Sequence, residues 1–212
     1  MAISTMLITN SVNRIAWFYR RNGLRCTAVR FCTALRRFSY LGRMVLYACQ
    51  LPGEYLAKTT DVSVRPVTPA GISKPDYECL LDIWNPSLRA HQLADRFAAG
   101  SELWLAKVGD KLAGFGWTIQ GRTIEPYFFP LRPDDAHLFD FFVFPEFRGR
   151  GINVVLVMEI LAMLSQKQVH RAYIECAAWN DAEIRSLSKT AFRRYAEATQ
   201  VTLLGYTIVV WH

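Results

Sequence analysis

Apolar and polar positions follow one another along the chain with two different periods, and the change of period predicts where helices and strands lie. From about Ser11 to Arg37, apolar residues recur every three or four positions with arginines in many of the gaps, which predicts one or two helices. The apolar run Arg43–Leu51 ends at Pro52-Gly53 and predicts a strand. Residues 54–62 are polar and form the predicted linker.

From Val62 to the C-terminus, short alternating or apolar runs between turn residues predict strands, and longer runs with helical spacing predict helices. The predicted strands cover residues 62–67, 102–108, 111–119, 123–129, 138–144 and 171–177, and residues 201–211 form a closing strand or a pair of strands. The predicted helices cover residues 76–84, 88–99, 152–164 and 181–198. This alternation of strands and helices indicates an α/β sheet protein.

Two features within this pattern concern packing. The helix 152–164 is apolar nearly all round, so it must be buried on most faces, and it is too short to span a bilayer. Gly114 and Gly116 lie inside the strand 111–119, where glycine weakens a strand unless another group approaches the backbone closely. The sequence therefore predicts a buried helix soon after the strand 138–144.

Charge divides the chain unevenly. The 212 residues carry a formal net charge of +7, yet residues 1–53 hold eight arginines, no lysine and no acidic residue. Residues 54–212 hold 17 basic and 18 acidic residues and are almost neutral, which argues against a nucleic-acid-binding domain. We predict an Arg-rich helical extension at 1–58, with a strand near 43–51, and a domain at 59–212.

The predicted extension fits four roles. It can pack on the following domain, because many apolar residues lie between its arginines. Peripheral contact with an anionic membrane through residues 11–40, organellar targeting and contact with nucleic acid are the other three. Burial of Trp17, Phe18 and Phe31 would identify the extension as structural.

The cysteines and histidines show no spacing typical of a metal or redox site. Five cysteines are scattered without a C-x-x-C pair, and the four histidines are far apart. No segment has the pattern of a secretory signal, and no stretch approaches 18 uninterrupted apolar residues. We therefore expect reduced thiols, a cytoplasmic location and no bound metal.

The stretch PEFRGRGIN, between a predicted strand and the buried helix, carries the clearest chemical signal. Gly149 and Gly151 let the backbone turn sharply, and the helix that follows adds its unpaired N–H groups and the positive end of its dipole. Arg148 and Arg150 can add charged contacts, so the stretch predicts an anion site suited to a pyrophosphate. The alternative is an ordinary glycine turn with solvated arginines. No G-K-[ST] follows and no third glycine is present, which excludes the P-loop and the dinucleotide fingerprint.

This stretch, read as VFPEFRGRGIN, resembles the acyl-CoA-binding motif of the GNAT acetyltransferase superfamily, usually written R/Q-x-x-G-x-G/A. Arg148 supplies the first position and Gly151 the glycine, whereas Asn153 stands where glycine or alanine is usual. Asn153 at this position would crowd the pyrophosphate or add a donor to it.

A second stretch, Asn180–Phe192 (NDAEIRSLSKTAF), resembles the family's C-terminal segment N-x-x-x-I-x-x-Y-x-K-x-G-F. Leu187 stands in place of the tyrosine and Ala191 in place of the glycine. The hairpin WLAKVGDKLAGFGWTI resembles the family's second and third strands, so the resemblance covers roughly residues 60–210.

The resemblance implies a mixed, mostly antiparallel central sheet flanked by helices, with acetyl-CoA or another acyl-CoA as cosubstrate and no metal. It implies that the pyrophosphate binds the amides of the glycine turn and that the pantetheine arm runs along the preceding strand. The residues that it assigns to acyl-CoA are Phe142, Val143, Arg148, Gly149, Arg150, Gly151, Ile152, Asn153 and Asn180. For Asn180, a helix N-cap or turn residue is the alternative.

Glu175 and Asp140 are the candidate general bases, and Glu125 is the third. Carboxylates in strands rich in apolar residues lose hydration, which raises the pKa toward a useful value. The alternative is that they face solvent or pair with a cation. The family's usual general acid is the tyrosine that Leu187 replaces, and Tyr195 on the same predicted helix is a poor substitute.

Aromatic residues offer walls for an acceptor pocket, although core packing is the favoured interpretation for each of them. They are Trp84, Trp104, Trp117, Tyr127 and Phe128. The leading hypothesis is an N-acyltransferase in which an amine attacks the thioester directly, assisted by a base and an N–H near Val143. The alternatives are a non-catalytic acyl-CoA-binding or interaction module and a peripheral membrane protein. We expect a small-molecule or membrane-proximal amine as acceptor, and no nucleic-acid partner.

Overall fold

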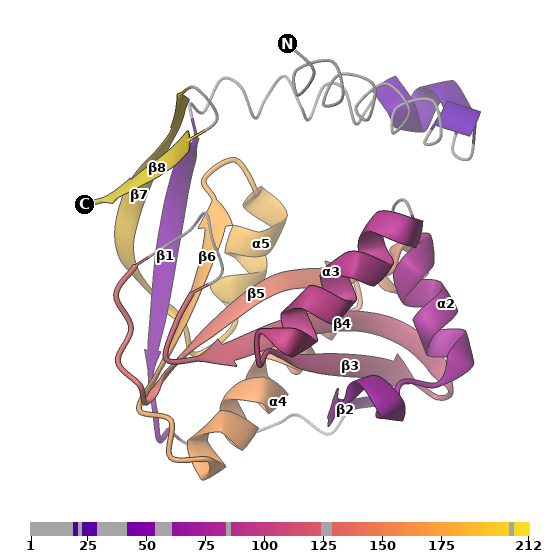
Figure 1. The fold of residues 1–212 in the computed structure, drawn as a ribbon, viewed down its shortest axis with the longest axis horizontal. Helices are drawn as coiled ribbons and strands as arrows, with labels where there is room; N and C mark the ends of the chain where they lie inside the picture. The colour runs from indigo at the N-terminus through magenta and orange to yellow at the C-terminus, as the bar shows by residue number, and fades with distance from the viewer. Residues whose placement is uncertain are drawn as a thin grey trace.

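The computed structural model describes residues 19–20, 23–28, 42–53, 61–83, 86–123, 129–203 and 206–212 (Figure 1). Residues 19–20 and 23–28, within the predicted front helices, are helical. Other predictions lie outside the described residues, wholly or in large part. They are the burial of Trp17, Phe18 and Phe31, most of the predicted linker, and the strand predicted at 123–129.

The described strands form one eight-stranded sheet in the order β2-β3-β4-β5-β6-β1-β7-β8. All neighbours are antiparallel except β5 and β6, which run parallel, so the predicted mixed and mostly antiparallel sheet is confirmed. The strands are β1 (Arg43–Gln50), β2 (Val62–Val67), β3 (Glu102–Val108), β4 (Lys111–Gln120), β5 (Asp135–Val143), β6 (Arg171–Ala177), β7 (Arg193–Leu203) and β8 (Tyr206–Trp211).

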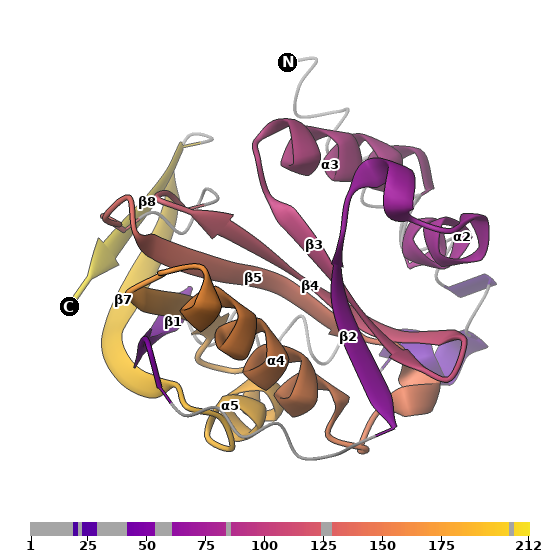
Figure 2. The same cartoon turned by 90° about the horizontal axis from the view of Figure 1, so that it is seen from below.

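Helices cover both faces of this sheet (Figures 1 and 2). They are α2 (Lys74–Asp82), α3 (Pro86–Ala98), α4 (Ile152–Gln166) and α5 (Asp181–Leu187), with short 3₁₀ helices η1 (Pro69–Gly71) and η2 (Pro145–Phe147). Because side chains alternate along a strand, Leu138 and Ile174 pack in the cluster that contains α4. Phe139 packs instead in the cluster that contains residues of α2 and α3.

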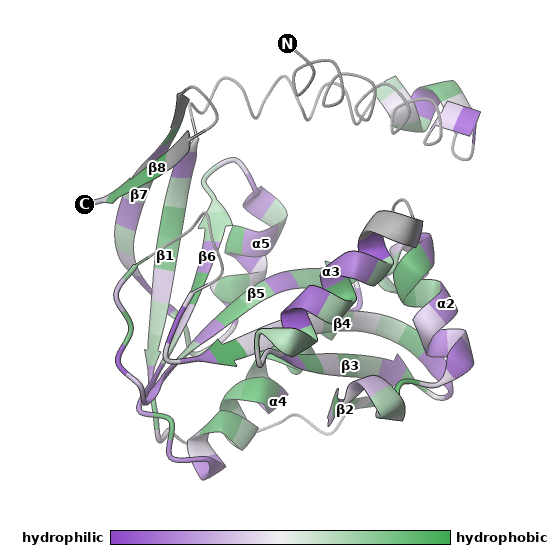
Figure 3. Cartoon of the chain, in the orientation of Figure 1, coloured by the Kyte–Doolittle hydropathy of each residue, from purple (hydrophilic) through white to green (hydrophobic). Residues whose placement is uncertain are grey.

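The helix α4 is buried as its sequence predicts. Six of its residues lie in the core, and its ribbon is coloured mostly as apolar in Figure 3. These residues are Ile152, Leu156, Val157, Ile160, Leu161 and Leu164. In the described ranges, no helix combines the length and the apolar character needed to cross a membrane.

The strand predicted near 43–51 is present as β1, and it lies inside the sheet between β6 and β7. Leu46 pairs with Glu175 of β6 on one side and with Ala196 of β7 on the other. Side chains on both faces of β1 are buried, which explains why the run is continuously apolar and does not alternate. The sheet therefore crosses the predicted boundary between residues 58 and 59, and the division itself stays a prediction.

The helix predicted at 181–198 is wrong in its second half, because α5 ends at Leu187 and β7 begins at Arg193. Thr190 explains the stop. Its Oγ1 donates a hydrogen bond to the carbonyl oxygen of Leu187 at 2.7 Å and accepts one from the N–H of Phe192 at 3.2 Å. Tyr195 is consequently a strand residue on β7 and not a helical one.

Candidate functional site

The parallel strands β5 and β6 separate part of the way along their length. Their pairing runs from Asp135 with Arg171 to Leu138 with Ile174, and no pair follows. Beyond this point β5 continues to Val143 and β6 to Ala177. The two strand ends therefore leave an opening in the sheet.

A bulge in β5 bends the strand where the opening starts. Two steps along β4, from Phe115 to Trp117, correspond to three steps along β5, from Phe142 to Phe139. Asp140 lies in this bulge with a φ of 49°, a conformation that Asp tolerates better than most residues. The extra residue increases the local twist and turns the end of β5 away from β6.

The predicted close approach to Gly114 and Gly116 is found at this bulge. A Cβ on Gly114 would lie 2.8 Å from the carbonyl oxygen of Phe142, and one on Gly116 would lie 2.6 Å from the ring of Phe141. Gly114 must therefore be glycine for β4 to receive the bulged strand, because its close neighbour is backbone, whereas a Cβ at Gly116 would force the ring of Phe141 to move.

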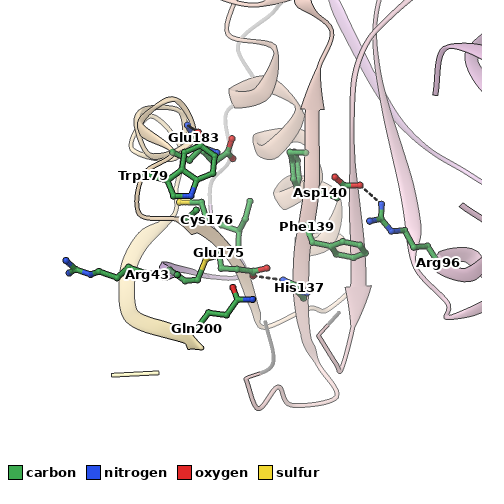
Figure 4. A pocket seen from close by; sticks show the side chains of 16 residues that line it. Arg43, Arg96, His137, Phe139, Asp140, Glu175, Cys176, Trp179, Glu183 and Gln200 are labelled. Atoms are coloured by element: carbon green, nitrogen blue, oxygen red, sulfur yellow. Dashed lines mark hydrogen bonds and ion pairs between the residues drawn. The ribbon is translucent and has the colours of Figure 1, made fainter. Parts of the chain in front are cut away.

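The opening forms a cleft of about 580 Å³, which we call the splay cleft (Figure 4). It is lined by Gly42, Arg43, Met44, Arg96, His137, Phe139, Asp140, Phe141, Ile174, Glu175, Cys176, Ala177, Trp179, Asn180, Glu183 and Gln200. The volume is typical of small-molecule sites. Glu175, Asp140 and Asn180 of the predicted site line it, whereas Phe142, Val143 and residues 148–153 do not.

Glu175 and His137 form a buried pair at the closed end of the splay cleft (Figure 4). The Oε2 atom of Glu175 lies 2.6 Å from Nε2 of His137, and the two side chains are 5% and 0% exposed. The imidazole stacks on Phe139, with ring centroids 5.3 Å apart. A carboxylate held by a ring nitrogen in this way is well placed to accept a proton from a bound molecule.

Sequence reasoning found Glu175 but missed His137. The available signal was the alternation of side chains, because Leu138 and Ile174 are paired core residues on one face. Their neighbours, His137 and Glu175, therefore share the opposite face. The parallel register that brings them together is a long-range feature, which the spacing of histidines in the sequence does not reveal.

Asp140 is held by two arginines of α3. Its Oδ2 accepts hydrogen bonds from Nη1 of Arg89 at 3.2 Å and from Nη1 of Arg96. Burial alone would raise the pKa of Asp140, but the charges and hydrogen bonds of Arg96 and Arg89 together lower it. A carboxylate with a lowered pKa is a weak base, so this geometry argues against the predicted catalytic role of Asp140.

The anion loop (residues 148–151) leads directly into α4. Gly149 has a φ of 80° and Gly151 a φ of 77°, and a Cβ at either position would meet no atom of the described residues within 4 Å. The need for glycine there comes from the backbone conformation. The helix α4 starts without a side-chain cap, so its first N–H groups can bind a phosphate.

The two arginines of the anion loop lie against aromatic rings. Arg148 donates from Nε to the carbonyl oxygen of Val143 at 3.1 Å, and its guanidinium lies 5.7 Å from the ring centroid of Phe142. Arg150 lies 5.6 Å from the ring centroid of Phe147. Both arginines remain exposed and can contact an anion at the loop.

Asn153, in the first turn of α4, turns its side chain toward α5. Its Nδ2 donates to the two carboxylate oxygens of Glu183 at 3.2 and 3.3 Å and to Oγ of Ser186 at 2.9 Å. Burial raises the pKa of Glu183, and the hydrogen bond from Asn153 acts in the opposite direction. Asn153 therefore joins the first turn of α4, directly after the anion loop, to an acidic residue of the splay cleft.

The remaining residues considered for the site are a helix cap, a core residue and an exposed strand residue. Asn180 caps α5, with its Oδ1 accepting from the N–H of Glu183 at 3.3 Å, and it also lines the splay cleft. Leu187 is fully buried in the core, and Tyr195 is 62% exposed. The leucine side chain has no acidic proton, and Tyr195 does not line the cleft, so neither supplies an acid there.

The aromatic residues that the structure describes pack in the core, which is the interpretation that the sequence favours. Trp104 and Trp117 are fully buried in the core, and Nε1 of Trp104 donates to Oγ1 of Thr118 at 2.9 Å. Trp84, Glu125, Tyr127 and Phe128 lie outside the described residues. The described part of the chain contains no group of three or more His, Cys, Asp or Glu side chains that could hold a metal ion.

Cys176 lies in the splay cleft beside Glu175. Burial, reinforced by the charges of Glu183 and Glu175, raises the pKa of Cys176 to about 12. The thiol therefore stays protonated at neutral pH and is a poor nucleophile.

The model of the Acetyltransferase (GNAT) family matches residues 72–192, which is more than half of the chain. A search of curated proteins gave no match. Solved structures with a similar fold include a GCN5-related N-acetyltransferase from Sphaerobacter thermophilus, with 15% identity and a TM-score of 0.55 over 78% of this chain and 54% of that one.

An acetyltransferase from the GNAT family of Colwellia psychrerythraea is similar, with 13% identity and a TM-score of 0.54 over 73% of this chain and 53% of that one. The chain thus spans little more than half the length of these two proteins. At such identities the likeness concerns the fold alone.

Proposed function

Because the chain belongs to the acetyltransferase (GNAT) family, we propose that it transfers an acetyl group, or another acyl group, from acyl-CoA to an amine. The observation that carries this proposal is the splay cleft, with the buried Glu175–His137 pair at its closed end. The cleft offers a proton acceptor, and the anion loop offers N–H groups for a pyrophosphate.

Binding of acyl-CoA is assigned to the loop and the strand before it. The N–H groups from Arg148 to Asn153 would hold the pyrophosphate, because the glycine conformations leave the start of α4 open. Phe142 and Val143 would contact the pantetheine arm, and Asn180 at the cleft wall would hold one of its amides. Bound there, acyl-CoA supplies the thioester that the amine attacks.

Glu175 would act as the general base. It removes a proton from the amine while the nitrogen attacks the thioester carbon, and a backbone N–H near Val143 stabilises the oxyanion. The new C–N bond forms, the C–S bond breaks, and the CoA thiolate leaves. His137 holds the Glu175 carboxylate through Nε2 and is therefore a positioning residue. The protonated thiol of Cys176 favours direct attack over an acyl-cysteine intermediate.

Isothermal titration with acetyl-CoA, followed by thiol release over a broad panel of amines, tests the proposal. We expect binding and turnover with at least one small or membrane-proximal amine. Arg148→Ala should weaken binding by roughly tenfold, which corresponds to one charge-assisted contact. Absence of binding, together with no effect of Arg148→Ala, would overturn the proposal.

Two further variants separate catalysis from binding. Glu175→Gln should lower kcat by roughly 10²-fold or more while acetyl-CoA affinity is retained, because only the proton acceptor is lost. His137→Phe keeps a stacked ring against Phe139 but removes the hydrogen bond to Glu175, so it should lower kcat and leave the KM for acetyl-CoA unchanged. Unchanged kcat in both variants would contradict the assignment of the pair.

A non-catalytic acyl-CoA-binding module is the second candidate, and the fully buried Leu187 at the place of the family's tyrosine favours it. Binding of CoA without turnover on any amine would support this candidate. Pelleting with anionic liposomes would support membrane contact through residues 11–40. With either candidate function, we propose a cytoplasmic location.

A further inference from the structure

Breaking the thioester releases a thiolate, and a nearby acid that protonates it makes this step easier. We propose that Glu183 is this general acid and that Asn153 holds its carboxyl group against the start of α4. The inference rests on the proposed acyl transfer. It connects the two departures from the family pattern, because Asn153 contacts Glu183 and Leu187 lies one helical turn after it.

Glu183 is placed where an acid could reach the leaving thiolate. Glu183 lies on α5 and lines the same splay cleft as Glu175 (Figure 4). Glu183 and Glu175 both interact electrostatically with Cys176, so both carboxyl groups lie near this residue of the cleft. Three carboxyl groups line the cleft, and two arginines hold that of Asp140. Glu175 and Glu183 are therefore left, one for each proton transfer.

The contact between Asn153 and Glu183 also favours this role. Asn153 donates to both carboxylate oxygens of Glu183, at 3.2 and 3.3 Å, and these hydrogen bonds fix the orientation of the carboxyl group of this cleft residue. Glu175 is held by His137 on the sheet. The leaving thiol and the attacking amine therefore meet different carboxyl groups.

The surroundings of Glu183 favour its neutral form. Burial is the main cause of its raised pKa. Cys176 of β6 and Tyr47 of β1 are titratable groups that interact with it, and Asn153 of α4 donates hydrogen bonds to its carboxylate. No ion pair of Glu183 occurs among the described residues. By contrast, Asp140 is fixed in its ionised form by two arginines.

The proton balance closes with these two groups. Glu175 takes the proton of the amine as the C–N bond forms. Neutral Glu183 gives its proton to the sulfur as the C–S bond breaks, which yields the amide and the free thiol of CoA. Exchange with solvent then returns one proton to Glu183 and removes one from Glu175.

Glu183→Gln tests the role, because glutamine keeps the size and one acceptor oxygen for Asn153 but has no acidic proton to give. We expect kcat with acetyl-CoA to fall by roughly 10²-fold. The fall of kcat at high pH, where the wild-type acid loses its proton, should disappear. The loss should shrink to a few-fold with an acetyl thioester whose thiol is much more acidic than that of CoA.

Asn153→Ala supplies a second readout. The amide N–H groups stabilise the ionised carboxylate, so their removal should shift the high-pH limb of kcat to higher pH. The exposed Glu146→Gln is the matched control, and it should leave both the rate and the pH profile unchanged.

The outcomes separate the two proposals. Wild-type protein that neither binds acetyl-CoA nor releases CoA removes the proposed function and this inference with it. Wild-type turnover, combined with an unchanged rate and pH profile in folded Glu183→Gln, leaves acyl transfer standing and overturns the role of Glu183 alone. Retained acetyl-CoA affinity of the variant serves as the check that it is folded.

Discussion

At the scale of single residues, Asp140 shows how a charge can serve the shape of a site without taking part in its chemistry. Its carboxylate, 36% exposed, accepts hydrogen bonds from Arg96 and from the nearly buried Arg89. These contacts fasten α3 to the bulge that opens the splay cleft. The side chain therefore acts on the cleft through the position of the strand.

The lowered pKa of Asp140 predicts a pH-dependent contribution to stability. The contribution is complete above the unfolded-state pKa near 3.9 and is lost as the pH falls through the lower folded-state pKa. Asp140→Asn should reduce the free energy of unfolding at pH 7 by about 2 kcal/mol, less than for a fully buried pair because the carboxylate is partly exposed. Urea denaturation between pH 7 and pH 3 measures the difference between wild type and variant. A difference that stays constant over this range would contradict the assignment.

Glu175 and His137 show which part of the site can be predicted from single residues and which part cannot. A carboxylate in an apolar strand is visible in the sequence, so Glu175 could be predicted. Its partner depends on the register of β5 against β6 and could not. The hydrogen bond from Asn153 to Glu183 has the same origin, since it joins residues 30 positions apart across two helices.

At the scale of elements, the spacing of apolar residues predicts well which helices and strands form. Local polar contacts determine the residue at which a helix ends. The hairpin of β3 and β4 and the helix α4 follow their sequence signals. The C-terminal end of α5 does not, because apolar spacing continues past the residue where Thr190 redirects the backbone. Side-chain hydrogen bonds of this kind compete with helical ones and are hard to identify in a sequence.

The contacts of Thr190 predict the effect of replacing it. Thr190→Val keeps the shape but leaves the N–H of Phe192 without its hydroxyl partner, whereas the carbonyl oxygen of Leu187 keeps the hydrogen bond from the N–H of residue 190. We expect the free energy of unfolding to fall by about 1–2 kcal/mol. Thermal unfolding followed by circular dichroism measures this, with Thr190→Ser as the control that retains the hydroxyl. Equal stability of the valine and serine variants would refute the role of the hydroxyl in ending α5.

At the scale of the whole molecule, the cleft and the sheet draw on distant parts of the chain. The wall of the splay cleft includes Arg43 and Gln200, which lie on β1 and β7. The sequence predicts a strand at 43–51, yet its place between β6 and β7 depends on pairing with partners more than 120 residues away. Such pairing leaves no local pattern, so the predicted extension could not be recognised as part of the sheet.

The place of β1 predicts that the fold needs it. Without β1, both β6 and β7 lose a row of backbone hydrogen bonds, and the core loses Val45, Leu46 and Tyr47. A fragment of residues 54–212 should therefore show no cooperative unfolding transition in urea. Addition of a peptide of residues 42–53 should restore the transition, whereas the same peptide with Leu46→Asp should not, because a charge would enter the cluster around Phe129 and Tyr173. Cooperative unfolding of the fragment alone would show that β6 and β7 close the sheet without β1.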